Sequence, residues 1–227
     1  MTKPKVAVIG TGGTISSVGK GPLDILDYSA NGVILAVDEL IALFPQVHEV
    51  AEVIAVPFRA IPSTAMGYPE WRALVLKIDE IAAAHADLAG VVITHGTATL
   101  EETAYLLQLT LKVDFPVVLI GAQRPASSLS PDAGFNLVNG IRTAACAQAR
   151  GLGVLTLLND EIHCAREVTK TSTYRLQTFR TPDFGCLGHA DGDAVVFYRK
   201  PMRRTAPDCE FDIRQLDSLP RVDIVYS

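Results

Sequence analysis

The segment VIGTGGTISS, residues 8–17, ends an apolar run in a glycine-rich turn that carries Thr14. Two glycine patterns that bind phosphates do not fit this segment. A dinucleotide-binding turn needs a third glycine where Ile15 stands, and a Walker-type loop needs a Gly-Lys-Ser/Thr sequence that does not follow. Helix capping alone explains an isolated turn of this kind. The use of the Thr14 hydroxyl therefore has to be argued from the rest of the chain.

Short runs rich in Val, Ile and Leu alternate with helical stretches along the chain. This pattern is typical of a parallel sheet covered by helices on both faces. We expect strands at residues 6–9, 50–56, 91–94, 117–120, 154–158 and 194–198. We expect helices at 69–85, after Thr99, and at 135–149. At Thr99, the sequence Thr-Leu-Glu-Glu predicts a capping box in which Glu102 reaches back to the backbone. The sequence thus predicts an α/β fold with a mostly parallel central sheet.

Composition argues against several classes of protein. The 227 residues include 20 Lys or Arg and 25 Asp or Glu, a formal net charge of −5, and no polybasic run. We therefore expect neither nucleic acid nor an anionic membrane surface as a partner. The chain has no signal-peptide pattern and no apolar run near the length of about 18 residues that spans a membrane, so we expect a cytoplasmic protein. The four cysteines lack a Cys-x-x-Cys pair, which favours reduced packing residues over a metal centre.

Two further segments supply groups that a threonine nucleophile needs. A threonine hydroxyl is a weak nucleophile at neutral pH and requires a nearby proton acceptor and donors for the developing oxyanion. THGTAT, residues 94–99, has three threonines where a strand meets a helix N-terminus. REVTKTST, residues 166–173, has Lys170 among hydroxyls after another strand. Open α/β sheets bind ligands at the carboxyl ends of their strands, so we expect these segments to converge there for acyl transfer.

Five motifs resemble, in order and spacing, the bacterial L-asparaginase and glutaminase family across nearly the whole chain. They are TGGTIS, THGTATLEETAYLLQLTLK, GAQRP, DAGFNLVNGIRTAA and REVTKTST. The resemblance implies a flavodoxin-like, three-layer N-terminal domain followed by a smaller α/β domain, in subunits that form dimers or tetramers. It also implies hydrolysis of a small-molecule side-chain amide without a metal or organic cofactor.

The same resemblance implies roles for nine residues. Thr14 is expected to be the nucleophile, assisted by Tyr28, while Thr97 and Lys170 form a second hydroxyl–amine pair. Ser63 is expected to hold the α-carboxylate of the substrate. The other expected substrate-binding positions are Thr64, Gly13, Gly96 and Ala98.

Ala98 departs from the family pattern. The family has Thr-Asp-Thr where this chain has Thr-Ala-Thr, and the missing carboxylate would grip the α-ammonium of the substrate and support Lys170. A charge-assisted hydrogen bond of this kind contributes roughly 1.5–3 kcal/mol, so we expect weakened binding of asparagine. A substrate without the ammonium, an engineered knock-out and decayed activity all explain the alanine. Asp24 or Asp27 is a hypothetical replacement for the charge, although turn chemistry also explains each of them.

Residues 1–198 are expected to form the catalytic domain, and the polar, proline-punctuated residues 199–221 a linker. Residues 222–227 are expected to be the first strand of a missing or truncated C-terminal domain. Two alternatives for the function stay open. One is a hydrolase of another amide, a cyclic imide or a lactone, and the other is a non-catalytic ligand-binding domain of the same fold.

The remaining polar residues have simpler explanations. We expect His95 to fix its turn through a backbone hydrogen bond, and Arg124 and Arg166 to anchor loops. Glu101 and Glu102 are explained by the start of a helix, whose N-terminus favours negative charge.

Overall fold

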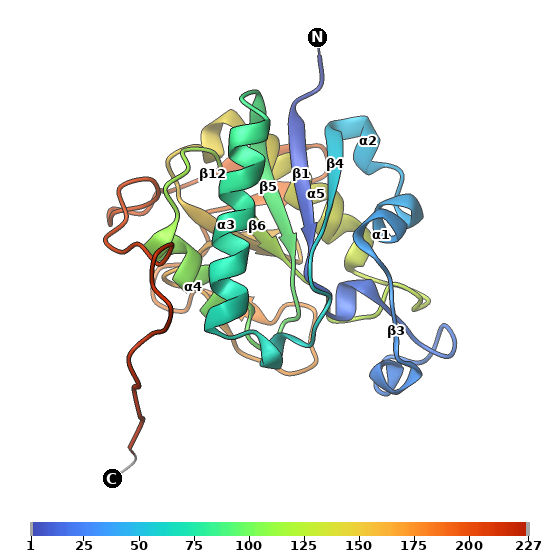
Figure 1. The fold of residues 1–227 in the computed structure, drawn as a ribbon. Helices are drawn as coiled ribbons and strands as arrows, with labels where there is room; N and C mark the ends of the chain where they lie inside the picture. The colour runs from blue at the N-terminus through green and yellow to red at the C-terminus, as the bar shows by residue number, and fades with distance from the viewer. Residues whose placement is uncertain (1, 226–227) are drawn as a thin grey trace.

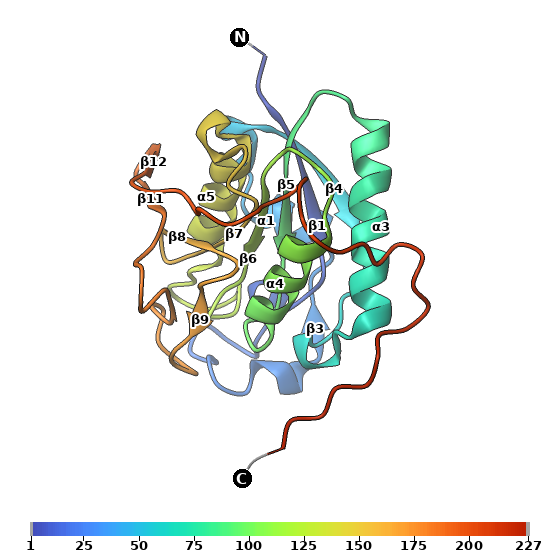
Figure 2. The same ribbon diagram turned by 90° about the vertical axis from the view of Figure 1, so that its left-hand side faces the viewer.

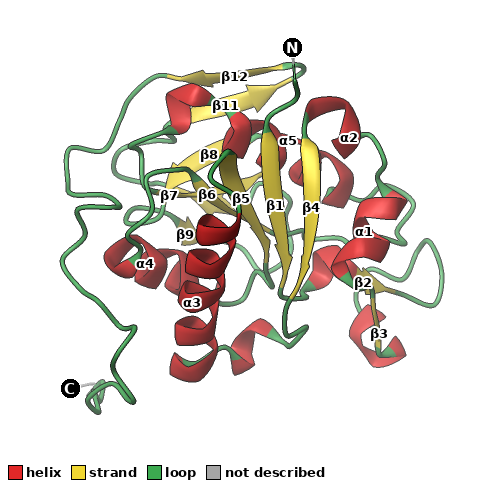
Figure 3. Ribbon diagram, turned by 45° about the horizontal axis from the view of Figure 1, so that its top comes forward, coloured by secondary structure: helices red, strands yellow, loops and turns green. Residues whose placement is uncertain are grey.

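A computed structural model of the protein describes residues 2–225 and has an α/β fold built on one eight-stranded sheet (Figure 1). In spatial order its strands are β12 (Ala194–Phe197), β11 (Gly188–Asp191), β8 (Glu161–Cys164), β7 (Val154–Leu158), β6 (Val117–Ile120), β5 (Leu88–Thr94), β1 (Lys5–Gly10) and β4 (Glu52–Pro57). The strands from β7 to β4 are parallel, and β8, β11 and β12 extend the sheet antiparallel at one edge (Figure 3). Numbered along the chain, the parallel strands have the spatial order 2-1-3-4-5, which confirms the flavodoxin-like arrangement.

Helices cover both faces of the sheet (Figure 2). One face carries α1 (Val37–Leu43), α2 (Val47–Val50) and α5 (Ala133–Ala145), and the other carries α3 (Tyr68–Ala84) and α4 (Leu100–Thr110). Successive strand residues point to opposite faces. Val6 and Val8 of β1 therefore pack with α1 and α5, while Ala7 and Ile9 pack with α3 and α4. Burial on both faces explains why this strand is apolar at every position from 6 to 9.

Most of the predicted elements are confirmed with small changes in their bounds. The strand expected at 50–56 begins at Glu52, because Val50 still belongs to α2. The helix expected at 135–149 ends at Ala145, because Cys146 has extended backbone dihedrals, and a separate 3₁₀ turn, η4 (Ala147–Ala149), follows. The strand expected at 194–198 is the antiparallel edge strand β12.

The predicted capping box at Thr99 is wrong. Helix α4 begins after Thr99 as expected, but the Thr99 side chain makes no capping hydrogen bond. Its Oγ1 instead donates to the carbonyl oxygen of Ser63 over 2.6 Å. Ser63 begins the 3₁₀ turn η3 (Ser63–Ala65). The hydroxyl therefore ties two loops together at the carboxyl end of the sheet and does not cap its own helix.

The residues expected to form a linker pack against α3 and α4 without regular secondary structure. Ile213 is 4% exposed and belongs to the core on the α3–α4 side of the sheet. Arg214 forms a two-pronged ion pair with Asp79 of α3, at 2.6 and 2.9 Å. Residues 222–225 carry no regular secondary structure, and 226–227 lie outside the described residues, so the domain boundaries stay a prediction.

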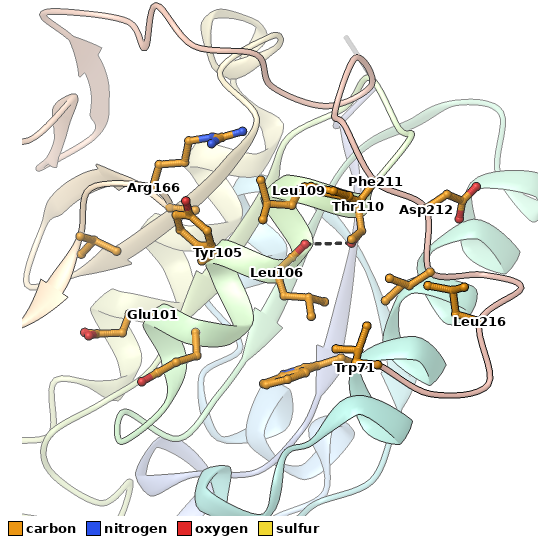
Figure 4. Close-up of a pocket in the computed structure, with 15 residues that line it drawn as sticks. Trp71, Glu101, Tyr105, Leu106, Leu109, Thr110, Arg166, Phe211, Asp212 and Leu216 are labelled. Atoms are coloured by element: carbon orange, nitrogen blue, oxygen red, sulfur yellow. Dashed lines mark hydrogen bonds between the residues drawn. The ribbon is translucent and has the colours of Figure 1, made fainter. Parts of the chain in front are cut away.

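An apolar groove of about 590 Å³ lies between α4 and this segment (Figure 4). Trp71 of α3 and Leu106 and Leu109 of α4 form one side, and Phe211 and Leu216 form the other. No residue of the glycine-rich turns at the ends of β1 and β5 lines this groove.

Two smaller findings concern composition. No helix within residues 2–225 has the length and apolar character needed to cross a membrane. All four cysteines are free, and Cys164 and Cys209 are buried, as expected for packing residues.

Candidate active site

The turn after β1 packs directly on the turn after β5. Gly13 has a φ of 91°, in the left-handed region that favours glycine, and leads into the 3₁₀ turn η1 (Thr14–Ser16). A Cβ atom on Gly13 would lie 2.5 Å from the backbone nitrogen of Gly96. A Cβ atom on Gly96 would in turn lie 2.7 Å from Oγ of Ser63. The two glycines thus allow three loops to meet without intervening side chains.

These loops form part of a cavity of about 630 Å³. It lies at the carboxyl ends of the adjacent strands β1 and β5, where the strand order reverses and where open α/β sheets bind ligands. All nine residues expected in the site line this cavity. They are Gly13, Thr14, Tyr28, Ser63, Thr64, Gly96, Thr97, Ala98 and Lys170.

Two hydrogen-bonded pairs lie in the cavity. Thr14 Oγ1 and the hydroxyl oxygen of Tyr28 are 2.7 Å apart, and either group can be the donor. Lys170 Nζ donates to Thr97 Oγ1, also over 2.7 Å. Each threonine hydroxyl therefore has a neighbour that can exchange a proton with it.

Lys170 is partly buried, and this changes its acidity. Burial lowers the pKa of its ammonium group below the usual value, and the negative charge of Glu101 opposes part of this shift. A lowered pKa increases the fraction of neutral amine, which is the form that can accept a proton. Lys170 has the electrostatic environment of a proton acceptor.

His95 supports the turn that carries Thr97. Its Nδ1 lies 2.8 Å from the carbonyl oxygen of Gly96, and its Nε2 lies 3.0 Å from Thr103 Oγ1. Thr103 Oγ1 accepts a hydrogen bond from Trp71 Nε1 over 2.8 Å, so its own proton is free to donate to Nε2 and Nδ1–H donates to Gly96. Burial lowers the pKa of His95 to about 4, so the ring is neutral near pH 7. The expected structural role of His95 is confirmed.

Sequence reasoning missed the rest of the cavity wall. The additional lining residues are polar Ser17, Ser29, Gln123, Thr173 and Tyr174, backbone at Gly32 and Pro62, and apolar Ile25, Leu26, Val33, Ile34 and Ile61. Gln123 is only 8% exposed, and its Nε2 has no hydrogen-bond partner among the described residues. A buried donor without a partner costs roughly 1–3 kcal/mol, which makes this amide a candidate contact for a ligand. Its position three residues after the apolar strand β6 is the signal that sequence analysis could have used.

Lys170 is the only Lys, Arg, Asp or Glu that lines the cavity in the described part of the chain. Asp24 and Asp27 do not line it. The Asp24 carboxylate accepts hydrogen bonds from the backbone nitrogens of Lys20 at 2.9 Å and Asp27 at 3.2 Å. Both carboxylate oxygens of Asp24 therefore accept hydrogen bonds from the backbone of its own loop. Neither aspartate contacts the cavity, so the hypothesis that one of them supplies a negative charge to the site gains no support and stays a prediction.

Three other expectations can be judged from contacts. Arg124 anchors its loop through the carbonyl oxygen of Ser130 at 2.9 Å, and Arg166 pairs with Glu210 at 3.0 Å, as expected.

Glu101 does more than begin a helix, since its carboxylate accepts a hydrogen bond from Thr169 Oγ1 at 3.1 Å. Within residues 2–225, no group of three or more His, Cys, Asp or Glu side chains could hold a metal ion.

Comparisons with known proteins bear on the whole chain. Residues 5–203 match the family model described as "Asparaginase, N-terminal". The chain is 39% identical over 224 residues to the probable periplasmic L-asparaginase of Haemophilus influenzae and covers 62% of that protein. It is 39% identical over 225 residues to L-asparaginase 2 of Escherichia coli and covers 63% of it. In each case 99% of this chain is matched, so the chain spans about three fifths of these relatives.

A solved structure gives the same result for the fold. The probable cytoplasmic L-asparaginase from Campylobacter jejuni superimposes with a TM-score of 0.92 at 39% sequence identity. The match covers 99% of this chain and 67% of that protein.

Proposed function

The chain belongs to the asparaginase family, and we propose that it hydrolyses a small side-chain amide with Thr14 as the nucleophile. The main support is that two hydrogen-bonded pairs, Thr14 with Tyr28 and Lys170 with Thr97, line one cavity. A site that only bound a ligand would not need both pairs. The names of the relatives, L-asparaginase and glutaminase-asparaginase, support the same class of reaction.

In the first half of the reaction, Thr14 Oγ1 forms a bond to the carbonyl carbon of the amide. Its proton passes to the hydroxyl of Tyr28, 2.7 Å away, as Tyr28 gives its own proton to the amide nitrogen. The carbon–nitrogen bond then breaks, and the protonated nitrogen leaves as ammonia. The product of this step is an ester between the acyl group and Thr14.

In the second half, water attacks the ester and releases the acid. Neutral Lys170 is suited to accept a proton of this water through Thr97, because burial lowers its pKa and the two side chains are 2.7 Å apart. As the ester bond breaks, a proton returns to Thr14 Oγ1 and restores its hydroxyl. The negative charge on the tetrahedral intermediates is favoured by the N-terminus of α4, since Thr97 and Ala98 line the cavity just before this eleven-residue helix begins.

We infer that the preferred substrate lacks an α-ammonium group. Ala98 stands where a carboxylate would bind such a group, and no Asp or Glu lines the cavity in residues 2–225. Ser63 and Thr64 remain available to bind a substrate carboxylate through their hydroxyls, and the unpartnered amide of Gln123 can bind a further polar atom. The proposed class is therefore a carboxylic acid with a terminal amide and no amino group.

Assembly and location belong to the same proposal. We propose a homo-oligomer, as the family resemblance implies. We also keep the expectation of a cytoplasmic protein, although the matched relatives include one described as periplasmic and one described as cytoplasmic.

An ammonia-release assay tests the proposed function. The panel is asparagine, glutamine, succinamate, which is asparagine without its amino group, and one cyclic imide, with loss of a lactone followed separately. We expect the highest kcat/KM for succinamate and loss of activity in Thr14→Ala. Activity that survives in Thr14→Ala would contradict the assigned nucleophile. If no compound is turned over but succinamate still shifts the thermal unfolding temperature, the chain is a ligand-binding domain.

A further inference from the structure

Lys170 lies on a strand that does not belong to the main sheet. β9 (Thr169–Lys170) pairs only with β10 (Phe179–Arg180), in a two-stranded antiparallel ribbon. Thr97, by contrast, lies between β5, at the centre of the main sheet, and helix α4. The main-sheet ladder therefore does not fix the distance between the two side chains, and some other contact has to do so.

Glu101 provides such a contact. It lies in the first turn of α4, four residues after Thr97, and its carboxylate reaches across to β9. One oxygen accepts a hydrogen bond from Thr169 Oγ1 at 3.1 Å, and the other accepts one from the backbone nitrogen of Lys170. Both residues of β9 are thus bound by one side chain of the helix that follows Thr97.

We propose that Glu101 is a positioning residue that holds Lys170 within hydrogen-bonding distance of Thr97. The inference rests on the proposed function for its catalytic consequence, but the contacts themselves do not depend on it. Hydrogen bonds to a carboxylate are stronger than neutral ones. A two-residue strand that donates two of them keeps its backbone fixed while the lysine side chain moves a proton.

The charge of Glu101 gives a second, separable effect. It is the only charged side chain that raises the pKa of Lys170, against the lowering caused by burial. The other titratable groups that line the cavity are the hydroxyls of Tyr28 and Tyr174. Loss of the carboxylate charge is therefore expected to lower the pKa of Lys170 further, in addition to loosening its backbone.

The test compares Glu101→Gln with Glu102→Gln in the full chain, assayed with succinamate. Glu102 lies in the same helix turn and is exposed. It is therefore a matched control for helix charge and for the substitution itself. For Glu101→Gln we expect kcat to fall by about 10- to 100-fold, with KM changed by less than about twofold. We also expect the acid limb of its pH–rate profile to move to lower pH. Glu102→Gln should resemble the original protein.

A second variant and a second readout keep the inference testable if Glu101→Gln is unstable or if no amide is hydrolysed. Thr169→Val removes one hydrogen bond and keeps the charge, so kcat should fall by about two- to fivefold without a pH shift. The reactivity of Lys170 toward acetic anhydride, followed by mass spectrometry as a function of pH, reports its pKa without any turnover. If Lys170 reacts over the same pH range in Glu101→Gln and in the original protein, or if Glu102→Gln has an equal effect, the inference is overturned. The Thr14→Ala variant tests the proposed function and not the role of Glu101, so the two proposals can fail separately.

Discussion

The Thr97–Lys170 half of the cavity rests on buried, cross-linked elements, whereas the Thr14–Tyr28 half joins a buried turn to an exposed loop. Thr97 is 8% exposed and follows the turn held by His95. Tyr28 instead lies in residues 19–32, the loop between the short paired strands β2 (Ser17–Val18) and β3 (Val33–Ile34), where Leu23 is 82% exposed and Leu26 is 73% exposed. That loop is attached through a few hydrogen bonds, such as those from Gly19 to Ser127 and from Asn31 to Val18.

The difference in burial indicates that the two halves of the cavity have different functions. Thr97 and Lys170 are held in place by hydrogen bonds of His95 and Glu101. A loop with few buried contacts can change conformation at low cost, so Tyr28 and the neighbouring Leu26 can adjust to the acyl group that enters. The predictions below test whether the buried half is in fact the more sensitive one.

After the loss of activity expected for Thr14→Ala, the largest effect concerns Lys170. We expect Lys170→Met to lower kcat by about 10²- to 10⁴-fold, the range typical of losing a general base. In the original protein, activity should rise with pH through the pKa of Lys170, which burial holds below its usual value, because only the neutral amine accepts a proton. That acid limb should vanish in Lys170→Met. The measurement is kcat/KM as a function of pH. If the acid limb persists in Lys170→Met, it reports the titration of another group and the prediction is wrong.

Two glycine substitutions compare, through stability, the buried turn before Thr14 with the exposed loop after Tyr28. Gly32 has the left-handed helical backbone, with φ of 68° and ψ of 6°, where alanine costs roughly 1–2 kcal/mol. Gly13, with φ of 91° and ψ of 178°, lies in a region that essentially only glycine adopts, where alanine costs roughly 1–3 kcal/mol. A Cβ atom at Gly13 would also collide with Gly96, whereas nothing lies within 4 Å of one at Gly32. Overpacking adds about 1–3 kcal/mol, so Gly13→Ala should cost about 2–6 kcal/mol in urea unfolding. Equal costs at the two positions would contradict the described contact.

Acid should destabilise the fold because two histidines are buried. Burial lowers the pKa of His95 and of His163 to about 4, against 6.5 for an ordinary histidine. Between these values the unfolded chain binds more protons, so stability falls as the pH falls from 6.5 to 4. Each histidine should remove roughly 2 kcal/mol between pH 7 and pH 5. Urea unfolding at the two pH values measures the loss, and substitution of exposed His48 by Gln should not alter it.

The smallest expected effect concerns charge in the cavity. Ala98→Asp restores a carboxylate beside Thr97 and should improve the KM for asparagine about tenfold, with no gain for succinamate. Asp24→Ala, in the exposed loop, should change neither KM by more than about twofold, because its carboxylate binds the local turn. Steady-state kinetics with both substrates checks this pair. A larger change in KM for Asp24→Ala would indicate that Asp24 does contribute to substrate binding.

Much of the fold and the site follows from local sequence. Apolar runs such as residues 6–9 and 117–120 predict buried parallel strands, and the topology then brings their carboxyl ends together. The family resemblance is confirmed over residues 5–203. The strands β8 and β11, EIHC and GHAD, were not predictable in this way. Their sequences include charged or polar residues, and they extend because each pairs with a neighbouring strand.

The contacts that sequence did not reveal are long-range. Glu101 and Lys170 are 69 residues apart, and no spacing rule connects a helix start to a distant two-residue strand. Thr99 fits the capping pattern locally, but the carbonyl of Ser63, 36 residues away, takes its hydroxyl. In both cases a tertiary partner competes with the local one, and only the folded chain decides which partner is bound.

The packing of the segment after residue 203 has a practical consequence for trimming the chain. The family match ends at residue 203, yet Ile213 is inside the core and the carbonyl oxygen of Leu216 accepts a hydrogen bond from the Tyr68 hydroxyl at 2.6 Å. Cutting at the edge of the match would expose one wall of the helical layer formed by α3 and α4. A shortened chain should therefore extend to about Leu216 to keep these contacts, and a protease that nicks the chain before Ile213 should loosen α3 first.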